Sequence, residues 1–477
     1  MTDTIPREAR VEASGPRGLP LAGNVFRAWS DPLSLMLEAS KDFGPVALLR
    51  FGWLRYYVAA DVDAIHRILQ TNAKNYVKSR NYAGVKYILG QGLLTSEGEK
   101  WLRQRRMIQP AFHHTRLPAF AETMASYAAS HVAGWSGMGD GPVDVHAEMM
   151  SLTLRIVGKT LFNVDLAGDA RSVGEALDVA IHWAQAYAEQ IVRLPPWVPT
   201  PGNLRFKRAL GTLDELVGRI IGERRATGVD EGDLLGMLMA ARDEDNGTGM
   251  NDTQLADEVK TLVLAGHETT ANALAFALHL LALHPEEQRR VQREADAVLG
   301  TKDVRFEDLP RLEAAERVVQ ESMRLYPPAW CFERDAIDDD TLSGTFVPKG
   351  SVVAVCPYAL HRSEAYWERP DAFEPDRFRP ERVAARPKQA YLPFGDGPRV
   401  CIGRAFAMME AKIILATIAQ RYRVEPAQGS EVDLEPGITL RPRGGLRVHL
   451  RPRRPGDAVR DATTHEPGAP SVSLLSA

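Results

Sequence analysis

Cysteine is scarce in this sequence. The only three, Cys331, Cys356 and Cys401, are spread over a chain of 477 residues. Three widely spaced cysteines cannot form the disulfide framework of a secreted domain, so we expect a reducing, cytoplasmic environment. An excess of one charge is also missing, since 58 basic residues stand against 62 acidic ones, and no nucleic-acid partner is expected. The segment 1–14 contains no long apolar run, so we expect neither a signal peptide nor a membrane anchor.

Cys401 closes a glycine-rich loop, Phe394-Gly-Asp-Gly-Pro-Arg-Val-Cys-Ile-Gly403, and an apolar helical pattern over 404–422 follows at once. A thiolate placed just before a helix is stabilised by the partial positive charge of the helix N-terminus. The glycines let the backbone turn sharply and approach a flat partner closely. Such a thiolate is a nucleophile or a metal ligand, and cysteine thiolate is one of the few protein ligands of haem iron.

A long, mostly apolar helix is predicted over 252–283, and the sequence Ala-Gly-His-Glu-Thr-Thr at 265–270 interrupts it at its centre. Gly266 is costly inside a helix, and Glu268 and Thr269 break the apolar pattern, which is typical of a functional site. A threonine hydroxyl beside a small-residue turn could hold a water and relay protons. The alternative is a polar seam that neighbouring helices satisfy.

Turn residues predict β structure at three places. Two short strands are expected at 46–50 and 56–59. The turn 347–351 separates two β-like runs and predicts a hairpin. The runs 436–440 and 444–451 predict a closing hairpin.

The spacing of Phe394, Gly397, Cys401 and Gly403 resembles the haem-binding loop of the cytochrome P-450 superfamily, the haem-thiolate monooxygenases. The sequence at 265–270 resembles the oxygen-activation motif of that family, and the resemblance extends from about residue 15 to 452. It implies a mainly helical single domain, 15–452, with a small β-rich region. We expect a flexible N-terminus, 1–14, and a disordered tail, 453–477.

The resemblance implies a role for each matching residue. Cys401 would be the axial thiolate ligand of haem b, and Thr269 and Glu268 would supply protons during O₂ activation. Further haem contacts are expected from Trp101, Arg105, Arg334, Phe394, Arg399 and Gly403. The substrate pocket is expected at Ala265, Gly266, Ala329, Trp330, Ile438 and Thr439. A buried structural triad that holds the cysteine loop is expected from Glu321, Arg324 and Arg377.

Trp101 and Arg105 are four residues apart on a predicted helix and share a face. An indole N–H and a guanidinium on one face suit a pair of carboxylates, such as the propionates of a haem. A basic face on the same helix would suit an acidic ferredoxin or flavodoxin served by a NAD(P)H-dependent reductase. The residues of that face are Lys100, Arg103 and Arg106.

The expected activity is insertion of one oxygen atom from O₂ into a lipophilic small molecule such as a fatty acid, terpene or steroid. The chain resembles soluble bacterial members without a fused reductase, so electrons would come from separate partners. Other functions stay open: a haem-thiolate isomerase, dehydratase or peroxygenase, and a haem sensor without turnover. A cysteine hydrolase with Cys401 as nucleophile would need a nearby histidine base. No role is assigned to His267 or His361.

Overall fold

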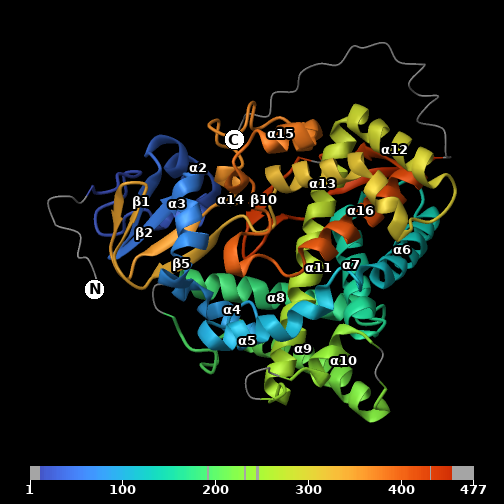
Figure 1. Ribbon diagram of the computed structural model, residues 1–477, viewed down its shortest axis with the longest axis horizontal. Helices are drawn as coiled ribbons and strands as arrows, with labels where there is room; N and C mark the ends of the chain where they lie inside the picture. The colour runs from blue at the N-terminus through green and yellow to red at the C-terminus, as the bar shows by residue number, and fades with distance from the viewer. Residues whose placement is uncertain (1–10, 191–192, 230–231, 243–246, 430, 454–477) are drawn as a thin grey trace.

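The computed structural model of the protein describes residues 11–190, 193–229, 232–242, 247–429 and 431–453. A large helical part lies beside a smaller β-rich part (Figure 1), as predicted. The longer helices are α2 Pro32–Asp42, α5 Gly98–Ile108, α6 Leu117–Gly134, α7 Val145–Phe162, α8 Ala170–Glu189, α9 Pro201–Thr227, α11 Asp252–Leu283, α12 Pro285–Leu299, α13 Glu313–Leu325 and α16 Arg404–Arg421. The shorter helices are α1 Val25–Ser30, α3 Val62–His66, α4 Ala83–Leu89, α10 Leu234–Ala240, α14 Pro357–Leu360 and α15 Pro380–Ala384.

The main sheet has the strand order β1-β2-β8-β5-β3 and is antiparallel except for the parallel pair β2–β8. Its strands are β1 Val46–Phe51, β2 Leu54–Ala59, β3 Tyr76–Lys78, β5 Phe332–Ala336 and β8 Val352–Val355. The smaller sheets contain β4 Val143–Asp144, β6 Asp340–Leu342, β7 Thr345–Val347, β9 Tyr422–Pro426, β10 Leu434–Pro436, β11 Leu440–Pro442 and β12 Arg447–Pro452.

Two predicted hairpins pair differently from expectation. The hairpin across 347–351 is wrong, because β7 pairs with β6 while β8 joins the main sheet between β2 and β5. The turn there carries the chain from one sheet to another. The closing hairpin expected from the runs 436–440 and 444–451 is also wrong, because the turn at 437–439 joins β10 to β11, and β12 pairs with β9 and β4 instead.

The helix predicted over 252–283 is confirmed as α11, and its first turn is capped by the Asn251 side chain, which accepts from the N–H of Gln254. Almost every residue along it is buried, so α11 passes through the core (Figure 1). A β-carbon at Gly266 would come within 2.9 Å of Val157 Cγ2 on α7. Close packing of two helices therefore explains this glycine in physical terms.

The segment at the N-terminus of the described chain is attached to the β-rich part. The N–H of Leu48 donates to the carbonyl of Ser14 at 2.8 Å, and the N–H of Phe346 donates to Val11 at 3.0 Å. These bonds hold residues 11–14, which were expected to be flexible together with 1–10. Of the expected tail, 453–477, only Arg453 is described, and it is held in place by an ion pair with Asp296 at 2.7 Å. Residues 1–10 and 454–477 lie outside the described residues.

No described helix combines the length and apolar character needed to cross a bilayer.

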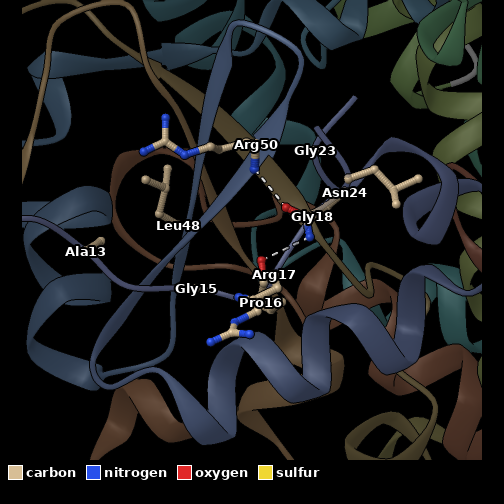
Figure 2. Close-up of a pocket in the computed structure, with 10 residues that line it drawn as sticks. Ala13, Gly15, Pro16, Arg17, Gly18, Gly23, Asn24, Leu48 and Arg50 are labelled. Atoms are coloured by element: carbon tan, nitrogen blue, oxygen red, sulfur yellow. Dashed lines mark hydrogen bonds between the residues drawn. The ribbon is translucent and has the colours of Figure 1, made fainter. Parts of the chain in front are cut away.

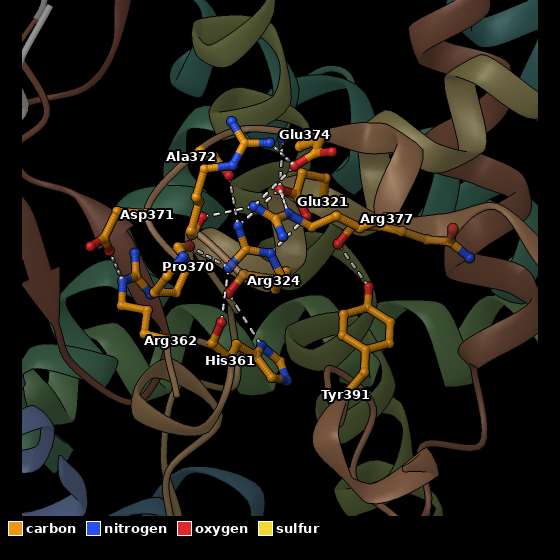
Figure 3. Close-up of polar contacts among 12 residues, drawn as sticks. Glu321, Arg324, His361, Arg362, Pro370, Asp371, Ala372, Glu374, Arg377 and Tyr391 are labelled. Carbon is orange, nitrogen blue, oxygen red and sulfur yellow. Dashed lines mark hydrogen bonds and ion pairs between the residues drawn. The ribbon is translucent and has the colours of Figure 1, made fainter. Parts of the chain in front are cut away.

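The three residues of the expected triad lie together in one cluster of polar contacts (Figure 3). Arg324 donates to both carboxylate oxygens of Glu321, at 2.7 and 2.8 Å, and both side chains are fully buried. Arg377 Nε lies 3.3 Å from Glu321 Oε1. Arg324 also donates to the carbonyl of His361 at 2.8 Å, and His361 Nε2 accepts from the N–H of Leu392 at 2.9 Å. The triad is thus connected through His361 to the chain just before the loop.

Candidate functional site

The loop 394–403 is held by a hydrogen bond within its own backbone and by contacts with Leu69 and Gln70. The N–H of Cys401 donates to the carbonyl of Phe394 at 2.9 Å. Gly397 has a φ of +69°, and a β-carbon there would lie 1.9 Å from the carbonyl oxygen of Leu69, so only glycine fits. Asp396 accepts a hydrogen bond from Gln70 Nε2 at 2.5 Å. These contacts give the loop one conformation before any partner binds.

The thiol of Cys401 borders space that the protein leaves open. Cys401 is exposed, although burial raises the pKa of its thiol. A hydrogen bond from the Gly403 N–H and the charges of Arg105 and Arg404 oppose that rise in pKa. Gly403 has an ordinary φ of −86°, and a β-carbon there would meet only Phe112, at 3.9 Å. Gly403 therefore leaves room beside the exposed Cys401 for a flat group to approach the backbone.

The centre of α11 also borders open space. Ala265 is exposed and Gly266 and Thr269 are half-buried, whereas the neighbouring turns of the helix are buried. The Thr269 hydroxyl donates to the carbonyl of Ala265 at 2.8 Å, so the helix continues through the motif. This face of α11 presents small side chains and one hydroxyl to the open space.

Glu268 and His267 point away from that face into the protein. Burial raises the pKa of Glu268, whose carboxylate accepts a hydrogen bond from the Thr439 hydroxyl at 2.5 Å. Burial lowers the pKa of His267 to about 4, and its Nδ1 lies 3.3 Å from the carbonyl oxygen of Val263. His267 is therefore a neutral core residue at pH 7, whereas Glu268 is a buried acid.

Helix α5 is attached to the cysteine loop by the residues predicted to contact a haem. Arg105 Nη1 donates to the carbonyl of Val400 at 2.8 Å. The guanidinium of Arg399 lies 4.2 Å from the centre of the Trp101 ring and also binds the carboxylate of Glu97. The structure thus brings Trp101, Arg105 and Arg399 together beside Cys401.

A further cation in this cluster, Lys78, was missed by the sequence reasoning. Strand β3 pairs with β5 so that Lys78 stands directly opposite Arg334. Like charges opposite each other on paired strands repel. Burial and the charges of Arg334 and Arg399 hold the pKa of Lys78 well below its usual range, and burial lowers that of Arg399 to about 10. The carboxylate that acts on both Lys78 and Arg399 is Glu97.

This cluster is suited to an anion. Three basic side chains, Lys78, Arg334 and Arg399, lie close enough for their charges to act on one another, and Arg334 is only 6% exposed, whereas Lys78 and Arg399 are half-buried. Buried charges normally require partners of opposite sign. A ligand that carries two carboxylates would neutralise the excess charge. Only the strand register reveals the cluster, because Lys78 and Arg334 are far apart in the sequence.

Four of the six residues expected at the pocket, Ala329, Trp330, Ile438 and Thr439, come together from two chain segments. Trp330 Nε1 donates to the carbonyl of Gly437 at 2.8 Å, and the N–H of Leu440 donates to Pro328 at 2.9 Å. Ala329 and Ile438 are half-buried beside these contacts. Thr439 is buried, and its hydroxyl is directed at Glu268.

Two cavities lie outside the residues predicted for haem and substrate. The first, of about 290 Å³, lies between the segment 15–18 and strand β1 (Figure 2), where Asn24 donates to Pro16 and accepts from Arg50. The second, of about 360 Å³, is lined by Arg103, Arg106, Met107, Pro110, Met237 and 240–242.

Two of the three residues expected on the basic face of α5 are exposed, and the third is not. Lys100 and Arg106 are exposed as predicted. Arg103 is half-buried instead and donates to the side chain and carbonyl of Thr248, at 2.8 and 2.9 Å. It therefore joins α5 to the segment before α11, and the exposed charge of this face comes from Lys100 and Arg106.

The comparisons with known proteins agree with this site. The model of the family Cytochrome P450 matches residues 13–447. The chain is 38% identical to the cyclooctatin synthase of Streptomyces melanosporofaciens over 445 residues, which cover 92% of this chain and 95% of that one. It is 34% identical to the cyclooctat-9-en-7-ol 5-monooxygenase of the same organism, over 89% of this chain and 92% of that one. It is 33% identical to the pentalenene oxygenase of Streptomyces avermitilis, over 94% of this chain and 98% of that one.

The chain belongs to the cytochrome P450 family of monooxygenases. The family implies a haem-thiolate cofactor, O₂ and an external source of electrons, as expected from the sequence. The residues present fit such a cofactor in three respects: an accessible thiol at Cys401, room beside Gly403, and a cluster in which Lys78, Arg334 and Arg399 gather around the one carboxylate, Glu97, that acts on both Lys78 and Arg399 among the described residues.

Proposed function

We propose that this protein binds haem b with Cys401 as the axial ligand and hydroxylates a polycyclic terpene hydrocarbon or alcohol. The observation that carries the cofactor assignment is the accessible thiol of Cys401 beside the cluster of the buried Arg334 and the half-buried Lys78 and Arg399. Bound haem supplies the O₂ chemistry, and the protein supplies its position, its shielding from water and the protons.

The cation cluster is the proposed site for the two propionates. Arg334, Arg399 and Lys78 would each face a carboxylate, and Trp101 would hold the Arg399 guanidinium in place through its ring. Arg105 would act on the other side of the thiol, since its charge stabilises the thiolate form of Cys401. Arginine forks and carboxylates form strong, directional hydrogen bonds. Lys78 is an addition to the set expected from the sequence.

Proton supply is proposed for Thr269 and Glu268. Thr269 borders the open face of α11, and because its hydroxyl donates to Ala265, its oxygen could accept a hydrogen bond from a water and hold that water beside the reacting centre. Glu268 is the next side chain inward, on the buried side of α11, where burial raises the pKa of its carboxyl group above the ordinary value and so favours its protonated form. The two residues would carry protons from the buried side of α11 to its open face.

Thr269→Ala is expected to uncouple electron use from product formation. The mutant should keep the helix, because alanine favours helices, and should lose the hydroxyl that orders the proton-donating water. We expect most of the electrons taken from NADPH to appear as hydrogen peroxide rather than as hydroxylated product. Measuring NADPH, peroxide and product in one assay with a surrogate ferredoxin system tests this. Thr270→Ala is the matched control, and equal coupling in both variants would remove Thr269 from the proton path.

The substrate class is proposed from the relatives. Two of them are named for cyclooctat-9-en-7-ol and pentalenene, which are compact polycyclic molecules. The half-buried side chains Ala329 and Ile438 are apolar and agree with a lipophilic ligand. The expected long-chain fatty acids and steroids are the alternatives that a binding test should include.

A spectral titration of the ferric protein tests the substrate class. Polycyclic terpenes should produce a saturable low- to high-spin shift of the Soret band at micromolar concentrations, because a ligand in the pocket displaces water. Fatty acids and steroids of similar size should give a shift only at concentrations at least about tenfold higher, which corresponds to about 1.4 kcal/mol. A tighter response to a fatty acid would contradict the terpene assignment and leave the haem assignment intact.

Electrons are proposed to come from a ferredoxin or flavodoxin with its NAD(P)H-dependent reductase. The exposed charges of Lys100 and Arg106 on α5 suit an acidic partner, and α5 contacts the cysteine loop through Arg105. A cysteine hydrolase is not favoured, because the charges that act on Cys401 among the described residues are those of arginines.

A further inference from the structure

A chain of hydrogen bonds leads to Glu268 from the outer side of α11. Thr439 Oγ1 donates to Glu268 Oε1 at 2.5 Å, and Asn272 Nδ2 donates to Thr439 Oγ1 at 3.4 Å. His146 Nε2 lies 2.9 Å from Asn272 Oδ1, and since an amide oxygen only accepts, the imidazole is the donor. Every bond in the chain is therefore directed toward the Glu268 carboxylate.

The chain joins three separate parts of the fold. Glu268 and Asn272 lie one turn apart on α11, Thr439 lies at the tip between β10 and β11, and His146 lies in the first turn of α7. Glu268, Asn272 and Thr439 are at most 8% exposed, whereas His146 is half-buried at the outer end. The Thr439 hydroxyl accepts from Asn272 while it donates to Glu268, so it cannot rotate without losing a bond.

The charged groups around the chain come from three further elements. Those that act on Glu268 are Arg441 on β11 and Asp178 and His182 on α8. Those that act on His146 are Asp144, Asp178 and Arg441, and His146 in turn acts on His267. Burial raises the pKa of Glu268, and the largest opposing effect is the hydrogen bond from Thr439, ahead of the charge of Arg441. Burial also lowers the pKa of His146.

The tip that carries Thr439 is itself fixed to the segment expected at the substrate pocket. Gly437 accepts from the Trp330 indole, and Leu440 donates to Pro328. Thr439 lies between these two anchor points. The backbone on each side of Thr439 is therefore bonded to the segment 328–330. A movement of that segment would move Thr439 relative to Glu268.

We propose that Thr439 is a positioning residue for proton delivery, which holds the Glu268 carboxylate in one orientation and is itself held by Asn272 and His146. This inference rests on the proton-supplying role proposed for Glu268. It assigns to Thr439 a part in the reaction rather than only contact with the substrate.

Thr439→Val removes the hydroxyl and keeps the shape of the side chain. The mutation should raise the pKa of Glu268 by about one to two pH units, because the ionised carboxylate loses a charge-assisted hydrogen bond. Infrared difference spectra of the ferric enzyme would follow the carbonyl band of protonated Glu268, identified by its loss in Glu268→Gln. In Thr439→Val this band should persist to higher pH. The pH profile of product formed per NADPH should shift in the same direction.

Two variants serve as controls. Thr439→Ser keeps a hydroxyl and should restore the wild-type band and pH profile. Thr417→Val removes another buried hydroxyl, which donates to the carbonyl of Ile413 at 2.7 Å within α16, and should change neither. If Thr439→Val and Thr417→Val lose thermal stability equally, that loss reflects the packing of the valine side chain. A shift of the pH profile in Thr439→Val alone reflects the loss of the hydrogen bond to Glu268.

The outcomes separate this inference from the proposed function. If the band in Thr439→Val titrates at the wild-type pH, the positioning role is wrong, whatever Glu268 does in turnover. If the band shifts but Glu268→Gln couples electrons to product like the wild type, Thr439 does position Glu268, and the proton-supplying role of Glu268 is wrong. A shift of both the band and the coupling profile supports the whole proposal.

Discussion

Cys401→Ala should abolish the thiolate-type carbon monoxide spectrum of the reduced protein and reduce product formation to background. In the proposed function the Cys401 thiolate is the ligand that donates electron density for O–O cleavage, and the methyl group of alanine offers no donor atom in its place. Cys401 is also the one cysteine that borders the open space beside Gly403. The measurement is the reduced carbon monoxide difference spectrum, together with haem content per protein and product yield.

Cys331→Ala is the matched control for that experiment. Cys331 is half-buried, and its sulfur lies 3.9 Å from the Tyr56 hydroxyl, in the β-rich part of the fold. The control variant should keep the thiolate spectrum even if the spin shift with substrate changes. A thiolate spectrum that survives in Cys401→Ala and disappears in Cys331→Ala would show that Cys331, and not Cys401, is the ligand.

Glu321→Gln should destabilise the protein by about 3–5 kcal/mol, because it leaves buried guanidinium groups without their carboxylate. Glu321 is fully buried and accepts from Arg324 twice, at 2.7 and 2.8 Å, and from the N–H of Glu374 at 2.8 Å. Arg324 in turn donates to the carbonyls of His361 and Pro370. The damage should therefore extend through His361 to Leu392 and loosen the cysteine loop.

Urea unfolding and the ratio of haem to protein would measure this effect. Glu313→Gln on the same helix is the control, since Glu313 pairs with Arg317 at 3.2 Å while its side chain is 69% exposed. An exposed pair of this kind contributes about 1 kcal/mol or less. If the two variants unfold at the same urea concentration and bind equal amounts of haem, the triad does not hold the loop.

Local features were predictable from the sequence. The helix predicted over 252–283 has these bounds in α11, and the strand predicted at 46–50 appears in β1 with one further residue. Apolar periodicity, an asparagine at the start of α11 and glycines at turns act over a few residues, so they can be recognised without the fold. The motifs around Cys401 and Thr269 are of the same local kind.

Strand pairing was not predictable from local patterns. The run before the turn 347–351 pairs with β6, and the run after it pairs with β2 and β5, although the two runs adjoin in the chain. Tertiary packing decides which edge a short strand joins, because each of these strands has too few side chains to specify its own partner.

The sequence by itself determined the family resemblance, the cysteine before α16 and the polar interruption of α11. Only the tertiary structure placed Lys78 opposite Arg334, because a cross-strand pair depends on the register between β3 and β5. Likewise, only the packing of three elements joined Glu268 to Thr439 and Asn272 to His146. Hydrogen bonds between distant segments form where burial removes water from polar groups, and a linear pattern does not record which groups are buried together.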